Sequence, residues 1–284
     1  MDKFRVKLLF LVLILFNINT NAQHKNDFEA GLFNIGFGGF VGAVGAVINK
    51  KQNEKTGRVI LRGFSKGALG GYLIFESKRL VGKYSKTGNY TYLWPSKLLN
   101  SAGVSILENA AANREFWDRW HLNIGFSRFE FYTNNKFKVT HRIMPFALSS
   151  TIYGFTQGKL DISKSAKVGN FVFIAEKIKF NETLYTEGKT IANSILLTKN
   201  PVSSTKEIIF AHEIIHIYQY ESFSGFNPFL NKPIDNLTKT KKWVNQYHKI
   251  FYTDYNFLFN GGLSLIETDH DKDFFENEAR FYTE

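Results

Sequence analysis

Residues 211–223 read AHEIIHIYQYESF and contain the pattern HExxH at His212, Glu213 and His216. The run of apolar residues around this pattern predicts a helix, in which residues four apart project from the same face. His212 and His216 can therefore bind one metal ion together. Glu213 is one position off that face, where its carboxylate can orient and deprotonate a metal-bound water molecule.

The surroundings of the pattern are unusually apolar. From Ile208 to Tyr220, Glu213 is the only side chain certain to carry a charge at neutral pH. A helix that is apolar on nearly every side is a buried helix, and a buried carboxylate without a partner is costly. A bound metal ion would supply that partner. The alternative is two core histidines and a glutamate that pairs with another group.

The order of elements around the pattern carries a resemblance. Strand-like residues 190–198, TIANSILLT, and a short loop precede the HExxH helix. This order resembles the zincin metallopeptidases over residues 165–284, and the string HEIIHIYQ is similar to uncharacterised bacterial HExxH domains. The resemblance implies that His212 and His216 are Zn²⁺ ligands and that Glu213 is the general base. It also implies an edge strand that holds the backbone of a peptide substrate beside the helix.

A catalytic zinc site needs a third protein ligand and one open position for water. Gln219 and Ser222 stand where the metzincin extension requires glycine and histidine, which excludes that subclass. The gluzincin arrangement takes a glutamate from a later helix. Residues 271–284, DKDFFENEARFYTE, predict such a helix, and Glu278 lies within its aromatic stripe.

We therefore expect Glu278 to be the third metal ligand, and a buried ion pair with a lysine or arginine is the alternative. Glu276 is expected to point into solvent and to pair with Arg280. Gln219 follows His216 by about one turn on the metal face, where it could hydrogen-bond a ligand or fill a polar slot in the core. The competing candidates for the third ligand are His248, Asp269, His270 and Asp271.

Two glycine-rich stretches precede these elements, residues 31–49 and residues 62–80. Small residues recur at every fourth position in both stretches: Gly38, Gly42 and Ala46, and then Gly63, Gly67 and Gly71. Stripes of small residues let two helices pack closely. The two stretches predict either a pair of membrane-embedded helices or a tight helical hairpin packed on the rest of the chain. We favour the hairpin, because the second stretch contains Arg62 and Lys66.

The remaining chain predicts a mixture of helix and sheet. Residues 95–113 read as a helix opened by Pro95. Residues 121–148 alternate about a turn at Asn134 and Asn135, which predicts a β-hairpin. The expected fold class is α+β, with a zincin-like mixed sheet, an HExxH helix and a C-terminal ligand helix. The expected division is a signal peptide (1–22), a helical region that is packed or membrane-associated (23–120) and a metallopeptidase domain (121–284).

The first residues predict export. Basic residues at positions 3, 5 and 7 precede an apolar run over residues 8–16 that is too short to span a bilayer. Cleavage before Gln23 would place the mature chain in the periplasm, the outer envelope or the extracellular medium. The chain has no cysteine, which excludes a disulfide framework.

The charge balance bears on partners. The formal net charge is +11, and it becomes +9 without residues 1–22, with 33 basic and 24 acidic residues. The basic residues are scattered and no nucleic-acid-binding motif is present, so we expect modest affinity for membrane surfaces and no nucleic-acid partner. The expected function is an exported Zn²⁺-dependent metallopeptidase that acts on peptides or proteins. The alternative is a non-catalytic envelope or membrane-associated structural protein with a structural or vestigial metal site.

Overall fold

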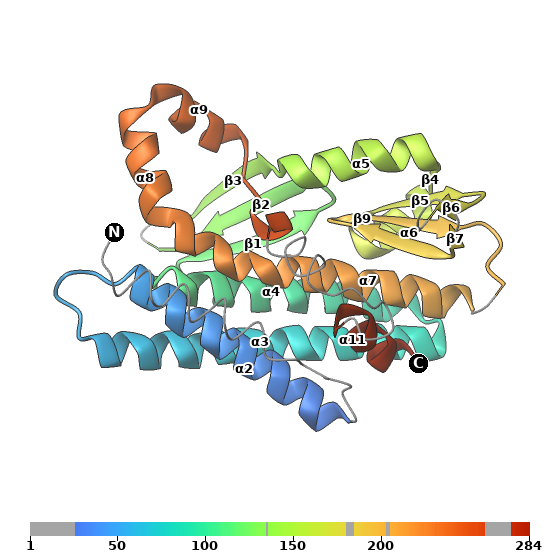
Figure 1. Ribbon diagram of the computed structural model, residues 1–284, viewed down its shortest axis with the longest axis horizontal. Helices are drawn as coiled ribbons and strands as arrows, with labels where there is room; N and C mark the ends of the chain where they lie inside the picture. The colour runs from blue at the N-terminus through green and yellow to red at the C-terminus, as the bar shows by residue number, and fades with distance from the viewer. Residues whose placement is uncertain (1–25, 135, 180–184, 203–204, 259–273) are drawn as a thin grey trace.

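The computed structural model describes residues 26–134, 136–179, 185–202, 205–258 and 274–284. The expected signal peptide, Asp269, His270 and Asp271 lie outside the described residues. Helices predominate, and the strands form small sheets, so the predicted α+β class is confirmed. Figure 1 shows a layer of long helices below, the strands above, and α7 between them.

The lower layer consists of α2 (Asp27–Ile48), α3 (Thr56–Thr87) and α4 (Leu93–Ala111). The 3₁₀ helix η1 (Tyr90–Tyr92) joins α3 to α4. Both glycine-rich stretches are therefore helical, as predicted.

The pair α2 and α3 packs through its two glycine stripes. A Cβ atom built on Gly63 would lie 2.6 Å from the carbonyl oxygen of Gly42 and 2.7 Å from the Cβ atom of Ala46. A Cβ atom on Gly67 would overlap the carbonyl oxygen of Gly38. The backbones thus touch directly, and the predicted close packing of the two stripes is confirmed.

The hairpin shares its core with the rest of the chain. Ala30 of α2 and Val81 of α3 belong to the same hydrophobic cluster as Ile215 of α7 and Ala279 near the C-terminus. Among the described helices, α2 is the one long and apolar enough to cross a membrane, and half of its most apolar window is buried against the protein. The two helices thus form a hairpin that packs on the rest of the chain.

The first sheet is an antiparallel meander of β1 (Arg119–Ile124), β2 (Ser127–Tyr132) and β3 (Lys138–Ile143). The hairpin predicted around Asn134 is the β2–β3 pair. A further tight turn at Gly125 joins β1 to β2, and its φ of 54° explains the glycine there.

The second sheet has the order β4-β5-β9-β8, so β8 lies at its edge. Its strands are β4 (Lys159–Leu160), β5 (Phe171–Ala175), β8 (Gly188–Ile191) and β9 (Ser194–Thr198). Strands β5 and β9 are parallel, whereas β8 and β9 are antiparallel.

The single strand predicted over residues 190–198 is wrong, because a tight turn divides it into β8 and β9. Ala192 adopts a φ of 48° in this turn, and Ile191 pairs with Ser194. The side-chain amide of Asn193 donates a hydrogen bond to the carbonyl oxygen of Gly125, 3.1 Å away, which holds the turn against the first sheet.

The helix that carries the HExxH pattern is α7 (Lys206–Ser222). Thr205 caps it, because the threonine hydroxyl accepts a hydrogen bond from the backbone N–H of Ile208. Residues on several sides of α7 are buried, among them Phe210, Ile214, Ile215 and Tyr218, which confirms the predicted burial. The other elements are α5 (Pro145–Gln157), α6 (Ile162–Val168), β6 (Ile178–Lys179), β7 (Tyr185–Thr186), η2 (Phe223–Leu230), α8 (Asn231–Thr240), α9 (Lys242–Ile250) and α11 (Phe274–Thr283).

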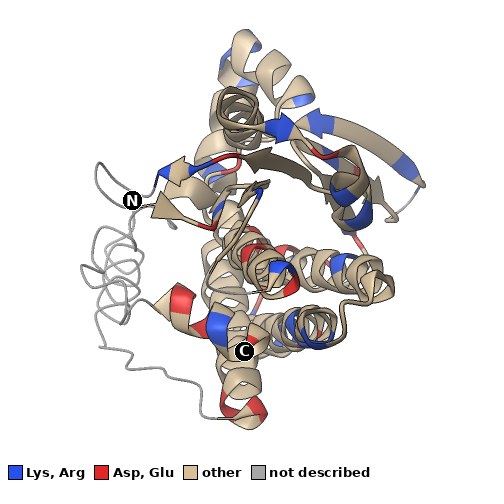
Figure 2. Ribbon diagram, turned by 90° about the vertical axis from the view of Figure 1, so that its right-hand side faces the viewer, with Lys and Arg blue, Asp and Glu red and all other residues tan. Residues whose placement is uncertain are grey.

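Basic side chains are spread over the molecule. Figure 2 shows lysines and arginines on strands as well as helices, interspersed with acidic residues.

The glycine contact between α2 and α3 predicts the effect of one added methyl group. Gly67→Ala should lower the free energy of unfolding by roughly 1–3 kcal/mol, because the new Cβ atom must push two backbones apart. The matched control is Gly36→Ala in α2, where a Cβ atom meets nothing within 4 Å. That change should raise the stability by up to about 1 kcal/mol, through helix propensity alone. Urea unfolding monitored by circular dichroism measures both variants, and equal stability of the two would contradict the packing.

Candidate metal centre

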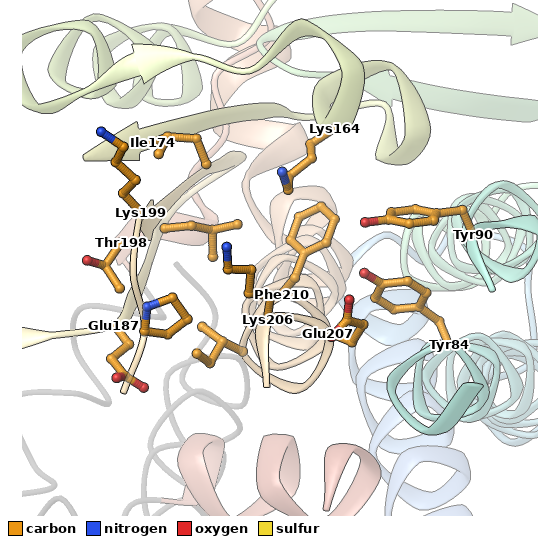
Figure 3. A pocket seen from close by; sticks show the side chains of 13 residues that line it. Tyr84, Tyr90, Lys164, Ile174, Glu187, Thr198, Lys199, Lys206, Glu207 and Phe210 are labelled. Carbon is orange, nitrogen blue, oxygen red and sulfur yellow. The ribbon is translucent and has the colours of Figure 1, made fainter. Parts of the chain in front are cut away.

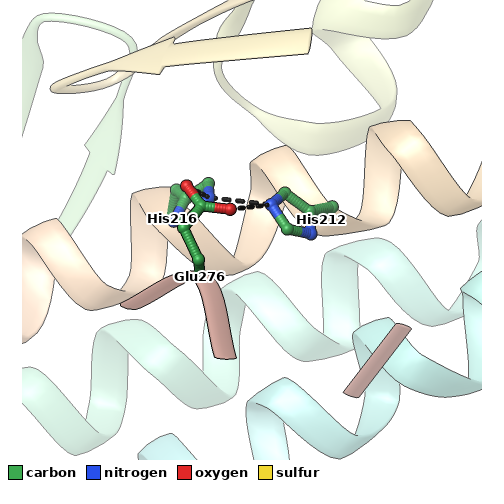
Figure 4. A group of neighbouring side chains, drawn as sticks. All are labelled: His212, His216 and Glu276. Carbon is green, nitrogen blue, oxygen red and sulfur yellow. Dashed lines mark hydrogen bonds and ion pairs between the residues drawn. The ribbon is translucent and has the colours of Figure 1, made fainter. Parts of the chain in front are cut away.

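His212 and His216 project from the same face of α7, as predicted. Their Nε2 atoms lie 3.0 Å apart, and each side chain is less than one-fifth exposed. Figure 4 shows both rings turned toward α11. Two imidazole nitrogens are therefore available at one point in space.

The third group at this point is Glu276 of α11. One carboxylate oxygen, Oε2, lies 3.1 Å from the Nε2 atom of His212, and the other, Oε1, lies 3.3 Å from the Nε2 atom of His216. One ligand atom from each of the three residues falls within 4.8 Å of the others. Two nitrogens and a carboxylate oxygen on one side of a point are the donor set of a three-ligand metal site. His212, His216 and Glu276 could therefore hold a metal ion.

The structure corrects the assignment of Glu278 as the third ligand. Its Oε1 atom lies 2.7 Å from the Nζ atom of Lys78, and the side chains of both residues are at most 3% exposed. Asn34 and Gln219 also donate hydrogen bonds to this carboxylate. Glu278 thus forms a buried ion pair with Lys78, which is the alternative that the sequence offered to a metal ligand.

The orientation of α11 explains the correction. The sequence suggested that the aromatic stripe of this helix faces the core, with Glu276 on the solvent side. In the structure the buried residues of α11 are Glu278, Ala279, Tyr282 and Thr283. The backbone of Tyr282 packs directly on Gly82 of α3. This contact fixes the rotation of α11, and the rotation brings Glu276 to the histidines.

Gln219 is a hydrogen-bond partner of the site. Its Oε1 atom lies 2.7 Å from the Nδ1 atom of His216, and its Nε2 atom donates to the carbonyl oxygen of Phe275 at 2.9 Å. Of the two sequence interpretations of Gln219, the contact with a candidate ligand is the one that the structure supports.

Glu213 lies beside the edge strand β8. Thr190 of β8 donates a hydrogen bond from its hydroxyl to the Oε2 atom of Glu213, at 2.7 Å. A Cβ atom on Gly188 would lie 2.9 Å from the Cγ atom of Glu213, so the absence of a side chain there leaves room for the carboxylate. Burial raises the pKa of Glu213, although the two histidines and the Thr190 hydroxyl act in the opposite direction.

His216 and Glu276 shift each other's pKa values in the metal-free protein. Burial alone would lower the pKa of His216, but hydrogen bonding to Glu276 and the nearby carboxylates raise it to about 9. Burial alone would raise the pKa of Glu276, but its hydrogen bonds to both histidines hold it well below the ordinary range. A positive imidazolium and a carboxylate therefore face each other when no metal is bound.

Of the competing candidate ligands, His248 is the one within the described residues, and it does not join this group. His248 lies on α9, whose contacts are with α8 and β3. Sequence reasoning missed Glu276, Thr190, Gly188 and Lys78. Of these, Glu276 alone could have been found from the sequence, because it is an acidic residue on the same predicted helix as Glu278, C-terminal to the HExxH pattern.

A separate pocket of about 230 Å³ lies at the N-terminal end of α7, between α3 and the strands β5 and β9 (Figure 3). Its apolar walls and its charged side chains are contributed by Tyr84, Ile174, Leu197, Phe210, Lys164, Lys199, Lys206, Glu187 and Glu207, among others. None of the three candidate metal ligands lines it, so it is a different feature from the metal centre.

Comparison of the chain with protein-family models, with curated proteins and with solved structures gave no match. The donor set is therefore the basis for any assignment. Imidazole and carboxylate together suit Zn²⁺ and other first-row divalent ions, whereas Ca²⁺ and Mg²⁺ prefer oxygen ligands alone.

The two glutamates of α11 provide a direct test of the third ligand. Glu276→Gln should weaken zinc binding by more than about 100-fold, because an amide replaces an anionic ligand. Glu278→Gln should act mainly on stability and cost about 3–5 kcal/mol, because it leaves the buried Lys78 without its counter-charge. Competition with a chromophoric chelator measures the affinity, and urea unfolding measures the stability. A larger loss of affinity in Glu278→Gln than in Glu276→Gln would restore Glu278 as the ligand.

Metal binding should also depend on pH. A metal ion must displace the proton from His216, whose pKa is raised to about 9 in the metal-free protein. The apparent affinity should therefore fall by roughly tenfold for each pH unit below 9, until other ligands also become protonated. Protonation of His216 also stabilises the metal-free fold. This contribution is fully present below pH 6.5, the ordinary pKa of histidine in the unfolded chain, and it is lost as the pH rises through the folded-state pKa of about 9. Isothermal titration calorimetry between pH 6 and 9 measures the dependence, and an affinity independent of pH would contradict it.

Proposed function

We propose that this chain is a Zn²⁺-dependent metallopeptidase. The observation that carries the proposal is the convergence of His212, His216 and Glu276, with the carboxylate of Glu213 on the next residue of the same helix. A structural metal site usually has four protein ligands, whereas a catalytic site has three and keeps one position open. Within the described residues, three ligand groups converge here, and this number favours a catalytic site.

When bound, Zn²⁺ would act as a Lewis acid that makes a water molecule more acidic and polarises the carbonyl group of a substrate. Glu213 would accept the proton of the attacking water and pass it to the leaving amine. Its burial suits this role, because a carboxylate removed from bulk water is a stronger base than an exposed one. Thr190 and Gly188 keep the carboxylate in one place beside β8.

The edge strand supports a peptide as the substrate class. Strand β8 is the last strand of its sheet, is antiparallel to β9, and holds Glu213 through Thr190. An extended peptide that paired with the edge of β8 left unpaired by the described strands would pass close to Glu213 and the histidines. The zincin resemblance implies the same placement of substrate, edge strand and helix. We further propose that the enzyme is exported, on the basis of the basic and apolar residues at positions 3–16.

The competing function is a non-catalytic envelope protein with a structural metal. The length and apolar composition of α2 are the features that favour it. The two functions differ in their need for Glu213, because a structural site requires no base beside the metal.

Glu213→Gln should therefore separate the two functions. We expect zinc affinity and fold to be retained while peptide hydrolysis falls by about 100-fold or more, since the amide cannot accept the proton. The matched control is Glu207→Gln, six residues earlier on α7, which should leave hydrolysis unchanged. The measurement is cleavage of a mixed peptide library followed by mass spectrometry. A wild-type protein that binds zinc but cleaves no peptide would favour the structural function.

A further inference from the structure

We infer that Gln219, Glu278, Lys78 and Asn34 form a positioning network that fixes His216 as an Nε2 metal ligand. The inference rests on the proposed metal site and assigns a role to the glycine-rich hairpin, which supplies two of the four residues. None of the four touches the metal position, and they act through His216.

The first step is the orientation of the Gln219 amide. Its nitrogen faces two acceptors, the carbonyl oxygen of Phe275 and the Oε2 atom of Glu278, both 2.9 Å away. The amide oxygen must therefore face the Nδ1 atom of His216, at 2.7 Å. An oxygen can only accept a hydrogen bond, so Nδ1 carries the proton. When a metal displaces the second imidazole proton, it is therefore the Nε2 atom that is left with a lone pair, and this atom faces His212 and Glu276.

The second step is the anchoring of Glu278. Lys78 donates to its Oε1 atom at 2.7 Å, and Asn34 donates to the same atom at 3.1 Å. Lys78 also donates to the side-chain oxygen of Asn34, at 3.0 Å. Burial alone would raise the pKa of Glu278, but the charge of Lys78 and the three donors outweigh burial and lower it. Glu278 thus remains an anion that accepts a hydrogen bond from Gln219.

The third step connects this network to the helical hairpin. Asn34 lies on α2 and Lys78 lies on α3. A Cβ atom on Gly71 would overlap the backbone carbonyl oxygen of Asn34, so the glycine lets α2 approach α3 at this level. The close packing of the two stripes therefore brings Asn34 and Lys78 to the same carboxylate. Lys78 and Glu278 are 200 residues apart in the sequence, and their contact links the hairpin to α11, the helix that also carries Glu276.

The central test is Gln219→Met, which keeps the side-chain length and removes the acceptor for the His216 proton. Zinc affinity, measured by chelator competition on the full chain, should fall by about 10- to 100-fold, the range for loss of a ligand's supporting hydrogen bond. The double variant Lys78→Met with Glu278→Leu removes both charges together, so no buried charge is left unpaired. It should give a smaller loss in the same direction, because Phe275 still orients the amide.

The matched control is the double variant Lys97→Met with Glu221→Leu. Glu221, two residues beyond Gln219 on α7, forms another buried ion pair with Lys97 of α4, in which the charged atoms lie 3.5 Å apart and both side chains are at most 4% exposed. This variant should lose stability but keep the zinc affinity of the wild type. An equal loss of affinity in the control would overturn the inference, since any damage to the core of α7 would then have the same effect.

A spectroscopic readout separates positioning from stability. In zinc-loaded protein with ¹⁵N-labelled histidine, His216 of the wild type should coordinate through Nε2 and show a protected Nδ1–H proton. In Gln219→Met that proton should exchange rapidly with solvent. Unchanged exchange together with unchanged affinity would overturn the positioning network while leaving the metal site intact. A wild-type protein that binds no zinc would instead overturn the proposed function, and the network's role with it.

Discussion

The burial of α7 is the constraint on which the rest of the structure depends. The helix is covered by the hairpin, the sheet and α11, yet it carries polar side chains along its length. A buried polar group without a partner costs free energy, so another element must supply a hydrogen-bond or charge partner for each of these side chains. Glu276 of α11 pairs with His212 and His216. Thr190 of β8 donates a hydrogen bond to Glu213, and Lys97 of α4 forms an ion pair with Glu221. These contacts fix the positions of α11, β8 and α4 around one helix.

Local periodicity explains which features the sequence predicted correctly. Two histidines four residues apart must share a helical face, and the structure places their Nε2 atoms 3.0 Å apart. The small residues of α2 and α3 recur with the same period, so their close contact was also predictable. Both predictions depend only on the geometry of single helices and on side-chain volume.

Features set by tertiary packing were not predictable in this way. The choice between Glu276 and Glu278 depends on the rotation of α11, which the contact of Tyr282 with Gly82 determines. Helical residues two positions apart, such as Glu276 and Glu278, point in directions about 200° apart, so a wrong estimate of the rotation assigns the wrong glutamate to the histidines. Lys78 is 200 residues from Glu278, and nothing in the local sequence connects them. The turn at Ala192 was hidden because a non-glycine residue adopts a positive φ there.

The convergence of His212, His216 and Glu276 is the claim on which the proposed chemistry depends. Its most direct measurement is an anomalous difference map at the zinc absorption edge, from crystals of the protein grown with Zn²⁺. The structure predicts one strong peak, about 2.0–2.2 Å from the Nε2 atoms of both histidines and from a carboxylate oxygen of Glu276. A peak coordinated by other residues, or no peak between these three side chains, would contradict it.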